Sequence, residues 1–145
     1  MEGAVTPLFL VAGKSRLRIM KTKKIIVKKG QEYHLLPLTD VAYFFADQKM
    51  VFCIDQQNRK HRTEYASLQD AYNTLDPRQF FKAGRKVILH LEHIKGYRPA
   101  EFGKLSVEVA TSPPVRLLLS QTTAPFFRNW IRNEPHHLPS AEEEE

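Results

Sequence analysis

The chain has 145 residues, which suits one domain with short extensions, and its 42% hydrophobic content is enough for a core, which excludes global disorder. It carries 22 Lys and Arg against 16 Asp and Glu, and because four of the acids form the terminal run 142–145, residues 1–141 carry a net charge of +10. A body this basic favours a polyanionic partner, usually nucleic acid, although a merely soluble basic protein has the same composition.

The chain has one cysteine, Cys53, within the apolar run 51–54, so it cannot form an internal disulfide and fits a reducing compartment. Its apolar stretches are far shorter than the roughly 20 residues that a membrane helix needs. The apolar run 7–12 resembles the core of a signal peptide, but no basic residue precedes it. We therefore expect a cytoplasmic protein without a membrane partner.

The sequence predicts an N-terminal linker or arm over residues 1–22, followed by one folded domain over residues 23–133. Gly30 and Gln31 indicate a hairpin turn. The strands that the pattern predicts here are 25–27, 33–36, 41–45, 50–54 and 59–65. A helix follows, with Ser67 as its N-cap, and Asp76-Pro77 ends it. Its apolar residues at helical spacing are Leu68, Ala71, Tyr72 and Leu75.

The second part predicts strands at 80–83, 87–91, 105–109 and 115–119, while residues 94–97 extend or bend the second of these. A last helix is expected after Thr122 or Thr123, with Pro125 near its start. Its predicted apolar face consists of Phe126, Phe127, Trp130 and Ile131. Residues 134–145 have the composition of a disordered acidic tail. Many short strands with two short helices predict a mainly β, antiparallel fold.

Residues that could perform chemistry are few and scattered. His90 and His93 are three apart, which predicts opposite faces of a strand rather than one metal site. Cys53 lies in an apolar run and is expected to be a buried core residue, and Ser120 does not lie in a nucleophile motif. The sequence has no zinc-ligand spacing and no glycine-rich phosphate loop. We therefore expect no enzyme, no cofactor and no metal site.

Basic residues gather in the predicted loops, and this is the positive functional signal. Arg85 and Lys86 follow Gly84 directly before an apolar strand, where they would face solvent. Lys and Arg bind phosphate oxygens, and Arg also binds guanine through two hydrogen bonds. For any single lysine, the alternative is protection of an exposed strand edge against aggregation. The other basic residues of these loops are Lys49, Arg59, Lys60, His61, Arg62, Lys82, Lys95, Arg98 and Lys104.

Five segments, taken in order from about Lys24 to Ile131, together form a recognisable pattern. They are 38–45 (LTDVAYFF), 65–75 (YASLQDAYNTL), 76–94 (DPRQFFKAGRKVILHLEHI), 102–109 (FGKLSVEV), and 118–120 with 126–131. The ordered set resembles the LytTR DNA-binding domain, the output module of many bacterial response regulators. Segment 76–94 is the most specific, because the family has there a Phe, a basic residue, one or two polar residues, Arg or Asn, and an apolar strand. The resemblance implies an elongated, mostly antiparallel β-sheet fold with two short helices, whose loops enter successive major grooves of DNA.

Transferred position by position, the resemblance also implies site residues. Base readout is implied for Gln48, Lys49, Arg85, Lys86, Gln121 and Thr122. Phosphate contacts are implied for Lys82 and Lys104, and we expect further ones from the basic cluster residues Arg59 and Lys60.

The chain also departs from the family at three of these places. The family usually has Ser-Arg where this chain has Ser120-Gln121, Gly84 replaces a polar residue, and His90 stands where Asn is usual. A guanidinium is therefore lost from the last loop. These departures leave open an alternative function, a LytTR-like protein-interaction module in which DNA binding has decayed.

The function that the resemblance implies is bacterial transcription regulation by sequence-specific binding of double-stranded DNA with repeated half-sites. Two copies would bind, as a homodimer on the DNA, because one small domain buries little surface. The segment before Lys23 is far shorter than a receiver domain. The chain would thus be either the output module of a two-component response regulator, with a receiver domain or sensor kinase as a further partner, or a stand-alone regulator.

Overall fold

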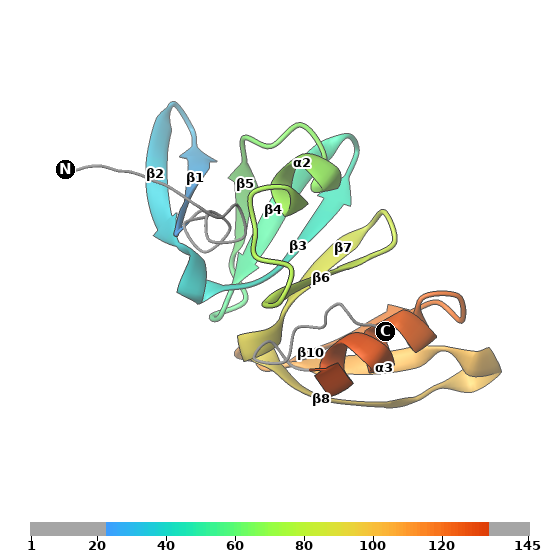
Figure 1. Cartoon of the computed structure of the whole chain (residues 1–145). Helices are drawn as coiled ribbons and strands as arrows, with labels where there is room; N and C mark the ends of the chain where they lie inside the picture. The colour runs from blue at the N-terminus through green and yellow to red at the C-terminus, as the bar shows by residue number, and fades with distance from the viewer. Residues whose placement is uncertain (1–22, 134–145) are drawn as a thin grey trace, which may run out of the picture.

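The computed structural model describes residues 23–133, and it consists of two antiparallel sheets and two helices (Figure 1). This confirms the predicted mainly β, antiparallel fold. The predicted arm over residues 1–22 and the predicted tail over residues 134–145 lie outside the described residues. None of the described helices is long and apolar enough to span a membrane.

The larger sheet has seven strands in the order β2-β1-β5-β4-β3-β7-β6. Its strands are β1 (Lys24–Lys29), β2 (Glu32–Pro37), β3 (Val41–Asp47), β4 (Met50–Asp55), β5 (Lys60–Thr63), β6 (Phe80–Ala83) and β7 (Val87–His90). A short 3-10 turn, η2 (Leu38–Asp40), leads from β2 into β3. Apart from β5, which is shorter than predicted, each strand overlaps its predicted range closely. Alternation explains this agreement, because in β1 the side chains of Ile25 and Val27 are buried while Lys24 and Ile26 are exposed.

Helix α2 (Leu68–Tyr72) covers one face of this sheet and closes the first core. The Ser67 hydroxyl accepts a hydrogen bond from the Asp70 backbone N–H at 3.0 Å, which confirms the predicted N-cap. The helix ends before Leu75, but Leu75 is still buried in the core that the helix closes. This core also contains Ile25, Val27, Phe44, Cys53, Phe80 and Ile88.

The smaller sheet packs against the opposite face of the larger one and forms the second core (Figure 1). Its strands are β8 (Ile94–Pro99), β9 (Leu105–Val109) and β10 (Val115–Leu119), in the order β10-β9-β8. Helix α3 (Ala124–Asn133) completes this core. The buried residues of the second core are Ala42, Ala83, Leu89, Leu105, Val107, Val109, Leu119, Ala124 and Phe127.

The apolar face of α3 differs from the predicted one at Phe126. Phe127 is fully buried, and Trp130 and Ile131 pack beside it, but 67% of Phe126 is exposed. The stripe that faces the core begins at Ala124 and repeats three to four residues later, so Phe126 lies off it. Trp130 fixes the helix to the rest of the chain, since its indole Nε1–H donates a hydrogen bond to the Pro77 carbonyl at 2.9 Å.

The chain passes from the larger sheet to the smaller one through a 3-10 turn, η3 (Leu91–His93). The prediction that His90 and His93 lie on opposite faces of a strand is wrong, because β7 ends at His90 and η3 brings the two rings to 5.0 Å. Each ring contacts a backbone carbonyl, His90 Nδ1 that of Val41 at 2.7 Å and His93 Nε2 that of Thr39 at 2.8 Å. Within residues 23–133, no group of three or more His, Cys, Asp or Glu side chains could hold a metal ion.

Candidate nucleic-acid interface

The turn between β3 and β4 carries two of the predicted base-reading residues, Gln48 and Lys49. Asp47 pairs with Met50, so the turn has two residues, and both have positive φ angles of 51° and 65°. Positive φ at both central positions is typical of the tight hairpin turns that match strand twist. Both side chains are exposed, at the end of a rigid hairpin.

The turn between β6 and β7 carries Arg85 and Lys86, as predicted. Gly84 begins it with a φ of +68°, a conformation that glycine adopts without a steric penalty. The Lys82 ammonium donates a hydrogen bond to the Gly84 carbonyl at 2.7 Å, which spans the turn from its first strand. The Ala46 N–H donates to the Lys86 carbonyl at 3.0 Å, so this turn lies beside the end of β3 and the turn that follows it.

The loop between β10 and α3, residues 120–123, carries Gln121 and Thr122. The Ser120 hydroxyl accepts a hydrogen bond from the Thr123 N–H at 3.2 Å and donates to the Thr123 hydroxyl at 3.0 Å. These bonds close the loop directly before α3 begins at Ala124, which agrees with a helix start after Thr123. Gln121 and Thr122 are exposed at the loop's tip.

An open groove of about 400 Å³ joins the second of these turns, between β6 and β7, to the third, between β10 and α3. It is lined on one side by residues 83–87 and on the other by Lys104, residues 118–120 and Thr123. Lys104 lies here because Leu105 pairs with Leu119 and therefore places it opposite Ser120. We call the surface formed by residues 48–49, 82–86, 104 and 120–123 the reading edge. In Figure 1 its turns lie on the right-hand side of the molecule.

The basic side chains of the reading edge have no acidic partner among residues 23–133, whereas three arginines elsewhere in the described chain do. Arg59, Arg78 and Arg116 each form an ion pair with a carboxylate, at 3.1–3.2 Å. Four basic side chains of the reading edge form no hydrogen bond or ion pair with any residue between 23 and 133, namely Lys49, Arg85, Lys86 and Lys104. Uncompensated positive charge on exposed turns creates a local potential that attracts an anion.

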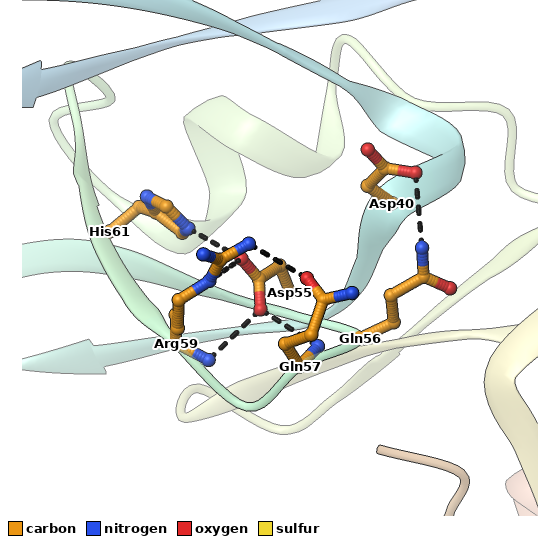
Figure 2. A network of polar contacts seen from close by, with 6 residues as sticks. All are labelled: Asp40, Asp55, Gln56, Gln57, Arg59 and His61. Atoms are coloured by element: carbon orange, nitrogen blue, oxygen red, sulfur yellow. Dashed lines mark hydrogen bonds and ion pairs between the residues drawn. The ribbon is translucent and has the colours of Figure 1, made fainter. Parts of the chain in front are cut away.

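The predicted phosphate-binding residues Arg59 and Lys60 do not lie on the reading edge. They follow the far end of β4, whereas Lys49 precedes its near end. The Arg59 guanidinium bonds to Asp55 at 3.1 Å and to Gln57 at 2.7 Å (Figure 2). The Lys60 ammonium lies 4.2 Å from the centre of the Phe52 ring, a cation–π contact. Both side chains therefore have partners within the protein.

Asp55 organises this far end as a buried polar network. Its carboxylate accepts hydrogen bonds from the backbone N–H groups of Gln57 and Arg59, both at 2.9 Å, and from His61 Nε2 at 2.9 Å (Figure 2). Burial acts to raise the pKa of Asp55, but these hydrogen bonds outweigh it, so the pKa is lower than usual. This network explains Arg59 and His61 as structural residues.

Cys53 and His90, which the sequence analysis considered as candidates for chemistry or metal binding, are both buried packing residues. Burial, with a smaller effect of the Asp55 charge, raises the pKa of the Cys53 thiol to about 12, so it stays protonated inside the first core. Burial lowers the pKa of His90, whose ring stacks on Phe80 with centroids 4.3 Å apart. His90 therefore belongs to the packing at the end of β7 that is far from the reading edge.

Sequence reasoning did not select Lys28, which lies near Lys49. An open hollow of about 460 Å³ is lined by Lys28, Lys49 and Arg62 together with Tyr33 and Glu64. Lys28 pairs with Arg62 across β1 and β5, and this register is the signal that would have found it. These two residues extend the basic surface from the first turn across the sheet.

Two comparisons with known proteins give the family and the fold of the chain. Residues 31–132 match the LytTR family, described as the LytTr DNA-binding domain. A solved structure of the LytTr DNA-binding domain of a Bacillus cereus protein superposes with a TM-score of 0.68 at 22% identity, and the match covers 76% of this chain and 97% of that one. At this identity, the superposition shows that the fold is shared. The family match spans most of the chain, and the chain belongs to the LytTR family of DNA-binding domains.

Proposed function

We propose that this domain binds double-stranded DNA sequence-specifically and regulates bacterial transcription through its reading edge. The observation that carries the proposal is the convergence of three turns on one side of the molecule, with exposed amides and with cations that have no acidic partner among residues 23–133. Family membership supports DNA as the partner, and LytTR is a family of DNA-binding domains rather than of enzymes.

The proposed base contacts come from the tips of the turns. Arg85 can donate two hydrogen bonds to guanine, while Gln48 and Gln121 can each pair with adenine through one donor and one acceptor. Lys49, Lys86 and Thr122 complete the set. Lys82 and Lys104, farther back from the tips, would contact phosphates and set the register of the domain on the duplex.

The phosphate roles of Arg59 and Lys60 stay predictions that the reading edge does not support. Their side chains are engaged at the other end of the larger sheet, by Asp55 and by Phe52. They would reach DNA only if the duplex ran past that end.

Two copies on repeated half-sites follow from the small size of the interface. One domain offers three short turns, and a second copy on the same duplex adds avidity without any new contact. We propose a homodimer on DNA, as the output module of a two-component response regulator or as a stand-alone regulator.

The test is fluorescence anisotropy with a pool of random duplexes at low and at moderate salt, followed by selection of the bound sequences. The expected result is salt-dependent binding with enrichment of a repeated motif, whose spacing gives the number of bound copies. Binding without enrichment would contradict sequence specificity. A protein that fails to bind at low salt would refute DNA binding and favour the interaction module.

A further inference from the structure

Phe102 is an exposed aromatic residue in an unfavourable backbone conformation. It lies in the 3-10 turn η4 (Glu101–Gly103) between β8 and β9, and 81% of it is exposed, more than any other large hydrophobic residue between 23 and 133. Its φ and ψ angles are 59° and 36°, in the left-handed region that bulky side chains rarely adopt. Its ring contacts no other aromatic ring in the described chain. The fold therefore gains little from a phenylalanine here.

The turn that presents Phe102 touches the third turn of the reading edge. A Cβ atom on Gly103 would come within 2.9 Å of the Gln121 Cγ atom, so the backbone of η4 lies directly against the side chain of Gln121. Lys104, which lines the groove, follows two residues after Phe102. The turn that carries the exposed ring thus lies beside a proposed base-reading side chain and next to a proposed phosphate contact.

We propose that Phe102 contacts the C5-methyl group of a thymine in the major groove that Gln121 and Thr122 enter. This inference rests on the proposed function, because it places the ring on the same DNA. The floor of the major groove offers hydrogen-bonding groups and one apolar group, the thymine methyl. A phenyl ring cannot satisfy the hydrogen-bonding groups, so thymine is the base it recognises. The turn also carries the exposed acid Glu101, but the groove that Lys104 lines next to it contains the cations Arg85 and Lys86, which favours DNA over an apolar protein surface as the partner.

The test is a double-mutant cycle that combines one substitution in the protein with one in the DNA. The DNA is the half-site obtained from the selection of bound duplexes. Each thymine is replaced in turn by 2′-deoxyuridine, which lacks only the methyl group, and affinity is measured for wild type and for Phe102→Ala. At one position, wild type is expected to lose about fourfold in affinity, the factor for burying one methyl group. Phe102→Ala is expected to bind the two duplexes equally.

Two control variants make the result specific. Leu35→Ala removes another exposed large hydrophobic residue, 64% exposed on the edge strand β2, and should keep the methyl dependence of wild type. Phe102→Asn should lose that dependence while unfolding at a midpoint no lower than wild type, because Asn accepts the left-handed conformation more readily. A retained fold with lost methyl recognition separates a DNA contact from a structural role.

The outcomes also separate this inference from the proposed function. If wild type binds a selected motif but no thymine methyl matters, or if Phe102→Ala keeps the methyl dependence, the thymine contact is refuted and DNA binding stands. If Phe102→Ala instead abolishes self-association measured by sedimentation and leaves methyl recognition unchanged, the ring is a protein contact. If wild type binds no DNA, both proposals are refuted.

Discussion

Asp55 gives the sharpest stability prediction, because its buried carboxylate accepts four hydrogen bonds. Replacing it with Asn keeps the shape and one acceptor oxygen. The backbone N–H groups of Gln57 and Arg59 both donate to Oδ1, so these two bonds can persist. The Arg59 Nε and His61 Nε2 atoms contact Oδ2, and after the substitution Asp55→Asn they would face an amide N–H₂ group instead.

The expected loss in the free energy of unfolding depends on how exposed Arg59 and His61 are, the two side chains that lose a hydrogen bond. The Arg59 side chain is 68% exposed, so water replaces its lost bond at little cost. The His61 side chain is only 9% exposed, and its Nδ1 atom already lacks a partner. His61 would lose its one charge-assisted hydrogen bond and remain buried, so we expect Asp55→Asn to lower the free energy of unfolding by about 2–3 kcal/mol at pH 7.

Urea denaturation measures this loss, with the fluorescence of the single tryptophan, Trp130, as the signal. The matched control is Asp40→Asn, since the Asp40 side chain makes a single hydrogen bond within residues 23–133, a long one of 3.4 Å to Gln56, and the substitution should change the free energy of unfolding by less than about 0.5 kcal/mol. The pKa of Asp55 is lowered in the folded protein, so its contribution is complete above the unfolded value of about 4 and is lost as pH falls through the folded value.

The difference between wild type and Asp55→Asn should therefore shrink in acid. A loss below about 1 kcal/mol at pH 7, or a difference that does not shrink below pH of about 4, would refute the role assigned to the network. DNA affinity of the folded variant should be unchanged, because Asp55 lies at the far end of β4 from the reading edge.

Three further predictions concern two residues of the reading edge and His90, at the far end of β7. Arg85→Ala should weaken binding to the selected motif by about 1–3 kcal/mol and relax its sequence preference. The control is Arg132→Ala, which removes an exposed cation at the end of α3 and should have neither effect. Equal effects of the two substitutions in anisotropy would contradict base readout by Arg85. Lys104→Ala should weaken binding to all duplexes alike and reduce the slope of log affinity against log salt by about one, and an unchanged slope would exclude a phosphate contact. The pKa of His90 is lowered by burial, so wild type should lose stability as pH falls below about 6.5, and His90→Asn should lose this part of the pH dependence in urea titrations.

Local sequence patterns were sufficient where alternation or a backbone signal fixed the element. The strands Leu105–Val109 and Val115–Leu119 have the predicted bounds, because apolar residues alternate in the first and Pro113-Pro114 precedes the second. The turn at Gly84 was also predictable, since only glycine takes its φ of +68° without strain.

Tertiary pairing decided the remainder, and no local pattern contains it. Residues 94–97 could extend or bend the preceding strand, and they form part of β8 in a different sheet because η3 leads the chain out of the larger sheet. His90 and His93 were assigned to a strand that ends between them. Phe126 was assigned to the apolar face of α3, but the position of the second core selects the neighbouring stripe.

The candidate site divides in the same way. That Arg85 and Lys86 occupy an exposed turn followed from the residues themselves, whereas the grouping of the three turns came from the resemblance to the family. The pairing of Arg59 with Asp55 depends on the tight turn that brings their backbones together, and the position of Lys28 depends on register. Such relationships need strand order, which one sequence does not contain.

The packing of the second core sets how far apart the turns of the reading edge lie. The first two turns of the reading edge belong to the larger sheet and the third to the smaller one, and the sheets are joined by side chains such as Leu89 and Leu119 rather than by shared strand pairing. The helical repeat of DNA is fixed, so the separation of the turns sets which base pairs they can reach together. If the three turns contact DNA as proposed, changes of side-chain volume between the sheets would shift which base pairs the turns reach together, while the residues of the reading edge stay the same.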